Sequence, residues 1–328
     1  MAGEERDLTN RDDSRPVRVK VDNVKKIYNT RNGEMVALNG VTLDIHDNEF
    51  ICVVGPSGCG KSTLLNIIAG LLEPTSGAVY CDGKEVKGTG TDRGVVFQQY
   101  ALFPWLTVKK NVMFALEMRG IKGKQAEEEA MKYLEMVQLE KFAEHYPKEL
   151  SGGMKQRTVI AISTILSPKV LIADEPSSAL DVTSQKMVIK MMRDLMEKGF
   201  IKSMIFITHE LPLLYNVTDD IMVMYAGQIV EKGTAKEMVF DPLHPYSKGL
   251  MGSIIVPEEG VREQKLTAIP GTPPNLKHPP EGCRFADRCP YAQPTCRGMK
   301  PEVIELPNGR EYRCLMSERK IREVYANV

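Results

Sequence analysis

The chain has 328 residues, enough for one large domain with an extension or for two modest domains. Hydrophobic residues make up 42% and charged residues 26%, as in an ordinary globular protein with a core. The 43 basic and 43 acidic side chains leave no excess charge that would favour nucleic acid or an anionic membrane surface. Residues 1–16 are charged and predict a disordered leader, and no apolar stretch approaches the roughly 20 residues of a spanning helix.

Between residue 17 and about residue 240, short β-rich segments alternate with helical patterns, which is typical of an α/β sheet domain. A mostly helical stretch from about 101 to 165 interrupts this alternation and predicts a helical subdomain inserted into the sheet domain. The expected elements are buried strands at 50–54, 170–174 and 204–208, helices at 61–72 and 187–195 with Gly199 as a stop, and a hairpin of 221–224 with 228–231.

The composition changes after residue 240. Prolines become dense between Pro270 and Pro280, and four clustered cysteines follow. This change predicts a separate, small C-terminal domain over residues 241–328.

A glycine-rich segment follows the first buried strand and precedes the first predicted helix, which is the context of a P-loop. Its backbone N–H groups would surround phosphates, Lys61 would neutralise the β- and γ-phosphates, and the Ser62 hydroxyl would ligate Mg²⁺. The alternative is a glycine-rich turn with an incidental lysine, which the flanking strand and helix disfavour. The expected nucleotide-binding residues are Gly55, Pro56, Ser57, Gly58, Cys59, Gly60, Lys61, Ser62 and Thr63.

The strand predicted at 170–174 ends in two acids, Asp174 and Glu175. After a P-loop, this pattern predicts a Walker B strand. Asp174 would hold Mg²⁺ through water, and Glu175 would polarise the attacking water. The alternative is a strand that two acids merely cap.

Between these two motifs lies the segment Leu150-Ser151-Gly152-Gly153, at the predicted start of a helix. Two glycines leave backbone donors open to an anion, and Ser151 adds a hydroxyl. An ordinary helix capped by serine is the alternative. In this position the segment resembles the signature motif of the ABC transporter ATPases, with Ser151, Gly152 and Gly153 contacting nucleotide.

The resemblance implies further site residues. Gln98 matches the Q-loop glutamine that ligates Mg²⁺ and senses the permease, and Gln99 is an alternative for it. Asp181 matches the D-loop, and His209 matches the switch histidine that faces the γ-phosphate. Tyr28 stands where the family places an aromatic that stacks on adenine, although it could also be a core tyrosine. Glu175, His209 and Gln98 would then be the catalytic residues.

The family's fold is a P-loop ATPase sheet core with an inserted helical subdomain, and its mechanism implies partners. ATP would bind between two cassettes, identical or paralogous, so that the Ser151 loop of one closes the Lys61 site of the other. Two membrane permease subunits, and indirectly an extracytoplasmic solute-binding protein, would complete an importer. The chain would then be a peripheral subunit on the cytoplasmic face of the cell membrane.

Different parts of the chain resemble two subfamilies. The stretch from Gly55 to Val108 looks like nitrate/sulfonate/taurine importer cassettes, whereas residues from Leu171 onward, including the extension, look like oligopeptide/dipeptide importer cassettes. The extension is the more distinctive, so an importer of oligopeptides or a related solute such as an oligosaccharide is expected. A tandem-cassette translation factor, a chromosome-maintenance ATPase, an exporter half and a soluble regulatory ATPase are the rival classes.

The segment from Tyr100 to Val108 is rich in apolar and aromatic residues and follows Gln98 directly. We expect it to line a groove that grips a coupling helix of the permease. Packing in the core is the alternative, because tryptophan is usually well buried.

Cys283, Cys289, Cys296 and Cys314 have the spacing C-x5-C-x6-C-x17-C. Disulfides are disfavoured in a chain without an export signal, and four unrelated thiols remain possible. Zinc ribbons favour tighter cysteine pairs, whereas wider spacing suits a cuboidal cluster. The resemblance points the same way, because some oligopeptide-type cassettes carry a [4Fe–4S] cluster in this extension. A [4Fe–4S] cluster is therefore predicted, with zinc as the alternative.

Overall fold

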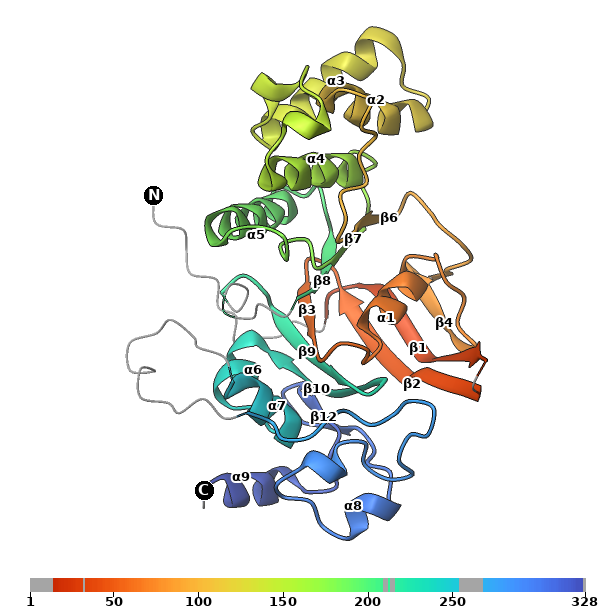
Figure 1. Ribbon diagram of the computed structural model, residues 1–328, viewed down its shortest axis with the longest axis vertical. Helices are drawn as coiled ribbons and strands as arrows, with labels where there is room; N and C mark the ends of the chain where they lie inside the picture. Colours follow the sequence, from red (N-terminus) through yellow and green to blue (C-terminus); the bar gives the residue numbers. More distant parts are fainter. Residues whose placement is uncertain (1–13, 32, 209–211, 213–215, 254–267, 327–328) are drawn as a thin grey trace.

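A computed structural model describes the fold, which is built around two β-sheets (Figure 1). The helical subdomain lies at one end of the molecule and the C-terminal extension at the other, with the sheets between them. The described residues are 14–31, 33–208, 212, 216–253 and 268–326.

The strands are β1 (Val17–Thr30), β2 (Gly33–His46), β3 (Phe50–Val54), β4 (Ser76–Cys81), β5 (Lys84–Glu85), β6 (Arg93–Val96), β7 (Val170–Asp174), β8 (Ser203–Ile207), β9 (Asp220–Tyr225), β10 (Gln228–Thr234), β11 (Ile304–Glu305) and β12 (Glu311–Tyr312). The α-helices are α1 (Lys61–Ile68), α2 (Val108–Met118), α3 (Gly123–Met136), α4 (Gly152–Thr164), α5 (Val182–Glu197), α6 (Ala235–Phe240), α7 (Pro245–Met251), α8 (Thr295–Gly298) and α9 (Glu318–Ala326).

The larger sheet has the strand order β11-β12-β10-β9-β3-β8-β7-β6. Strands β9, β3, β8, β7 and β6 run parallel to one another, so their carboxyl ends meet at one edge. Alternate residues of β3 enter two different cores: Phe50 and Cys52 pack with α5, whereas Ile51 and Val53 pack with α1 and the smaller sheet. The larger sheet is therefore covered on both faces, as its nearly continuous apolar strands require.

The smaller sheet is antiparallel, with the order β2-β1-β4-β5. The helical subdomain has its own core, in which α2, α3 and α4 bury residues such as Val112, Leu134 and Ala161. The strands, the hairpin and the helix ending before Gly199 are thus found where the sequence predicts them, and α2, α3 and α4 lie within the stretch that was expected to be helical. Within the described part of the chain, no helix is both long and apolar enough to cross a lipid bilayer.

The helix predicted at 61–72 is shorter than expected. It ends at Ile68, and Gly70 adopts the left-handed φ of 75° that terminates helices. A Cβ atom at Gly70 would collide with the backbone of Gly88. Leu71 consequently leaves the apolar face and is 48% exposed.

The C-terminal extension is joined to the sheet rather than detached from it. Strand β12 pairs with β10, with Tyr312 opposite Glu231. The Arg310 guanidinium lies 2.7 Å from the Glu231 carboxylate, and both side chains are buried. The expectation of a separate C-terminal cysteine domain is therefore not confirmed, and the boundary at residue 240 stays a prediction.

Candidate nucleotide site

The glycine-rich loop connects the carboxyl end of β3 to the first turn of α1. Gly60 caps this helix with a φ of 107°, a conformation that favours glycine. A Cβ atom at Gly55 would collide with the Met224 carbonyl oxygen, and one at Gly60 would lie 2.7 Å from the Ala37 carbonyl oxygen. Both positions therefore require glycine, because the loop is pressed against the backbone of two strands.

Lys61 lies over this loop. Its ammonium nitrogen donates hydrogen bonds to the carbonyl oxygens of Gly55 (2.7 Å) and Pro56 (3.1 Å). The Cys59 sulfur lies 3.9 Å from the same nitrogen, and burial raises the pKa of the Cys59 thiol, which keeps it neutral. The ammonium is thus the positive charge that the loop offers to an anion.

Asp174 ends β7 beside the start of α1. Burial raises the pKa of its carboxyl group, while a hydrogen bond with the Ser62 hydroxyl and the charge of Lys61 act in the opposite direction. The structure therefore brings together three of the residues predicted from the P-loop and Walker B motifs. A hydroxyl and a carboxylate side by side are oxygen ligands that suit Mg²⁺.

Glu175 follows β7 in a strained conformation. Its φ of 46° is left-handed, which costs a non-glycine residue about 1–3 kcal/mol and is common at functional sites. Hydrogen bonds hold it there: the Glu175 N–H donates to the Ile207 carbonyl (3.1 Å), and the Ser178 hydroxyl donates to the Glu175 carbonyl (3.0 Å). The Gln98 amide donates to the Glu175 carboxylate (3.2 Å), so Gln98 rather than Gln99 reaches this carboxylate.

Ser151 caps α4, and its hydroxyl accepts a hydrogen bond from the Met154 N–H (3.3 Å). The next residue, Gly152, packs against Tyr100 and Leu180, and Gly153 packs against Ser184. The signature segment therefore lies beside the D-loop segment within the chain. Within the described residues, no hydrogen bond joins it to the P-loop, and Figure 1 shows α4 and α1 in different parts of the molecule.

The remaining predicted residues are dispersed. Asp181 caps α5 and accepts hydrogen bonds from the Ser184 N–H (3.0 Å) and hydroxyl (2.7 Å), which lower the pKa of its carboxyl group. Tyr28 is half-buried on β1, opposite Met35, with the Lys26 ammonium 5.4 Å from its ring centre. His209 lies outside the described residues.

The four clustered cysteines gather in one region of the extension. Burial and, to a smaller extent, the neighbouring thiols of Cys283, Cys314 and Cys296 together raise the pKa of the Cys289 thiol to about 12, so these thiols lie near one another. All four are free thiols. Among the described residues, however, no group of three or more His, Cys, Asp or Glu side chains is placed to hold a metal ion. Neither the predicted [4Fe–4S] cluster nor zinc is therefore supported by this geometry.

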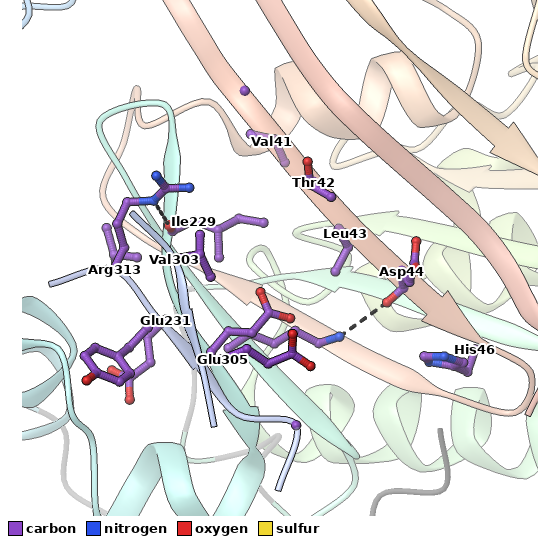
Figure 2. Close-up of a pocket in the computed structure, with 16 residues that line it drawn as sticks. Val41, Thr42, Leu43, Asp44, His46, Ile229, Glu231, Val303, Glu305 and Arg313 are labelled. Carbon is purple, nitrogen blue, oxygen red and sulfur yellow. Dashed lines mark hydrogen bonds between the residues drawn. The ribbon is translucent and has the colours of Figure 1, made fainter. Parts of the chain in front are cut away.

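A cavity of about 390 Å³ lies elsewhere, between β2, β10 and the strands of the extension (Figure 2). Its lining includes Asp44, Glu305 and Arg313, and the Arg313 guanidinium donates to the Ile229 carbonyl. No P-loop or Walker B residue lines this cavity. It is therefore distinct from the nucleotide site.

Comparison with known proteins agrees with this geometry. A family described as ABC transporter matches residues 38–178, and one described as oligopeptide/dipeptide transporter, C-terminal region, matches residues 230–296. The oligopeptide transport ATP-binding protein AppD of Bacillus subtilis is 36% identical over 322 residues, which cover 92% of this chain and 97% of that protein. The chain belongs to the ABC transporter ATP-binding proteins of the oligopeptide/dipeptide type. It is an ATPase subunit, and ATP with Mg²⁺ is consistent with this family.

Other relatives give the same family. The dipeptide transport ATP-binding protein DppD of Bacillus subtilis is 38% identical over 323 residues, covering 92% of this chain and 95% of that protein. The nitrate import ATP-binding protein NrtD of Synechocystis is 45% identical over 192 residues, covering 58% of this chain and 72% of that protein. Because the peptide-type relatives match across both halves of the chain, a distinct nitrate-type N-terminal half is not supported.

Among solved structures, the dimeric ATP-binding cassette MJ0796, bound to ADP and phosphate, superposes with a TM-score of 0.61 at 33% identity. The match covers 66% of this chain and 98% of that one. The P-loop ATPase fold of the cassette is thus confirmed.

Proposed function

We propose that the chain powers the uptake of oligopeptides, dipeptides or a related solute such as an oligosaccharide, through a separate membrane permease. The observation that carries the proposal is the match of residues 230–296 to the oligopeptide/dipeptide transporter C-terminal region, together with peptide-type relatives that span 92% of the chain. The partners would be a second cassette, two permease subunits bound at the cytoplasmic face of the membrane and, indirectly, an extracytoplasmic binding protein.

The roles of the site residues are also proposals. Lys61 and the P-loop N–H groups would bind the phosphates of ATP, and Tyr28 would stack on adenine. Ser62 and Gln98, with Asp174 through water, would hold Mg²⁺, which neutralises charge on the phosphates when it is bound. Glu175 would orient and deprotonate the attacking water, supported by its hydrogen bond with Gln98. His209 would face the γ-phosphate.

A second cassette would explain why the signature residues lie far from Lys61 of the same chain. Ser151, Gly152 and Gly153 present a helix N-terminus and lie beside the Asp181 segment, away from the P-loop of the same chain. An N-terminus of this kind binds anions. We infer that this face closes the P-loop of the partner cassette, as in a head-to-tail dimer.

An aromatic surface, formed by the exposed Trp105 and Phe114 with the half-buried Phe103, would bind the permease. Trp105 is 69% exposed, and the ring of Phe103 lies 5.5 Å from Trp105 and 4.9 Å from Phe114. The buried Asn111 side chain holds this loop, accepting from the Phe103 N–H (2.8 Å) and donating to three backbone carbonyls. Core packing of Trp105 is thus excluded, and a rigid, exposed aromatic is typical of an interface anchor.

Both proposals can be tested by measuring the uptake of a labelled tripeptide in cells that lack the native chain. The wild-type chain is expected to restore uptake, whereas Trp105→Ser is expected to reduce it at least tenfold, since losing an aromatic anchor costs about 2 kcal/mol or more of binding. Met299→Ser is the matched control, because Met299 is also exposed (56%) but lies in the extension. Its uptake should equal that of the wild type.

The outcomes separate the two proposals. Full uptake with Trp105→Ser would contradict the role of the aromatic surface. Tripeptide uptake that does not depend on the chain at all, with nitrate uptake that does, would contradict the substrate class.

The cysteine cluster remains a proposal as a [4Fe–4S] site, with zinc as the alternative. It is supported by the spacing of the four cysteines in the sequence. If the cluster forms, anaerobically purified protein should be brown, absorb near roughly 400 nm and contain about four irons per chain. Colourless protein with about one zinc would favour the alternative, and metal-free protein would contradict both.

A further inference from the structure

The turn between β9 and β10 lies directly against the P-loop. The Gly227 N–H donates to the Cys59 carbonyl oxygen (2.8 Å), and the Gly227 carbonyl accepts from the Asn39 N–H (2.9 Å). A Cβ atom at Gly227 or at Gly60 would lie 2.7 Å from the Ala37 carbonyl oxygen. The turn, the P-loop and β2 therefore touch backbone to backbone, and a displaced turn would displace the P-loop.

This turn holds an unfavourable residue. Ala226 and Gly227 have φ values of 49° and 80°, as a two-residue type I′ turn requires. Asparagine, aspartate and glycine are the usual residues for such a turn, whereas the Cβ atom of alanine disfavours a left-handed backbone. The sequence of the hairpin alone therefore does not favour the left-handed backbone that its turn adopts.

The C-terminal extension supplies contacts that hold the turn. The buried guanidinium of Arg284, only 9% exposed, donates a hydrogen bond to the Ala226 carbonyl oxygen. The Arg288 guanidinium donates to the Tyr225 hydroxyl (3.2 Å), and the Phe285 ring packs edge-on against the Tyr225 ring at 5.3 Å. A short segment of the extension therefore contacts the same turn that touches the P-loop.

We propose that Arg284 is a positioning residue for the ATPase reaction: by fixing the turn at Ala226 and Gly227, it keeps the P-loop backbone oriented toward the phosphates of ATP. The extension thereby sets the affinity of the nucleotide site.

Replacing Arg284 with glutamine tests the proposal in the full-length chain. The Kd for a fluorescent ATP analogue with Mg²⁺ is expected to rise about tenfold, because the P-loop loses part of the support that keeps it in its binding conformation. The KM for ATP in the assembled complex should rise in parallel, while kcat at saturating ATP stays near the wild-type value, because ground-state binding is what weakens.

Two further variants separate positioning from general stability. Ala226→Gly in the Arg284→Gln background should recover most of the affinity, because glycine adopts the left-handed conformation without strain. Arg297→Gln is the matched control: Arg297 belongs to the same region, but it is 68% exposed and pairs with Asp287 at 3.5 Å. It should bind the analogue like the wild type.

The proposal fails if Arg284→Gln binds the analogue like the wild type. It also fails if Ala226→Gly restores none of the lost affinity, since Arg284 would then only stabilise the extension. Should Arg284→Gln not fold, Arg284→Lys with and without Ala226→Gly gives the same comparison, because lysine keeps the charge and loses the fork-shaped donor.

Discussion

Replacing Glu175 with glutamine is expected to leave ATP affinity unchanged and to slow ATP hydrolysis about 10²–10⁴-fold, the usual contribution of a general base. Glutamine has the same shape as glutamate. It keeps an oxygen that can accept the hydrogen bond from Gln98, which is 3.2 Å long with the native carboxylate. The hydrogen bonds that hold residue 175 in its left-handed conformation involve backbone atoms of that residue and are also retained. What is lost is the negative charge and, with it, the ability to accept a proton from water.

The measurement is turnover of the assembled complex at saturating ATP, alongside the Kd of an ATP analogue. Glu128→Gln is the matched control. It makes the same chemical change on α3, at a side chain that is 63% exposed. It should hydrolyse ATP at the wild-type rate. Turnover of Glu175→Gln within a few-fold of wild type would show that another group is the base.

The core of the nucleotide site is predictable from sequence because its parts are local. An apolar strand, a glycine-rich loop and a helix follow one another within residues 50–68, so the P-loop can be placed without knowledge of the rest of the fold. Asp174 is predictable for a related reason: it ends a parallel strand of the same sheet, and the carboxyl ends of parallel strands meet at one edge.

The contacts of the extension could not be predicted in this way. Strand β12 has only two residues and pairs with β10 over a separation of about 80 residues, so no local pattern marks it. The same holds for Arg284, whose partner is a backbone carbonyl at the tip of a distant hairpin. A turn with alanine at a left-handed position is a local signal, but it shows only that outside support is needed and not which residue supplies it.

The exposure of Trp105 illustrates a different limit. The apolar and aromatic composition of the segment from Tyr100 to Val108 fits either a core or an interface. The burial of its side chains decides between the two, and burial is known only once the fold is known. In the structure, hydrogen bonds from the buried Asn111 side chain hold the loop, and the Trp105 indole is exposed to solvent.

Ser151 allows the two interpretations of the signature segment to be separated, because a helix cap and a phosphate ligand respond differently to charge. Aspartate and asparagine cap helices as well as serine does, so Ser151→Asp and Ser151→Asn should both unfold near the wild-type temperature. Alanine removes the acceptor of the Met154 N–H and should cost about 1 kcal/mol of stability.

If Ser151 faces the phosphates bound by a partner cassette, Ser151→Asp places a negative charge against them. Turnover of the assembled complex should then fall at least about 100-fold, as when an oriented donor is lost from a charged transition state. Ser151→Asn, which is nearly the same in shape but neutral, should lose less activity, and ATP binding to the separate chain should be unchanged in both. Wild-type turnover of Ser151→Asp would leave Ser151 as a helix cap alone and would contradict the head-to-tail dimer.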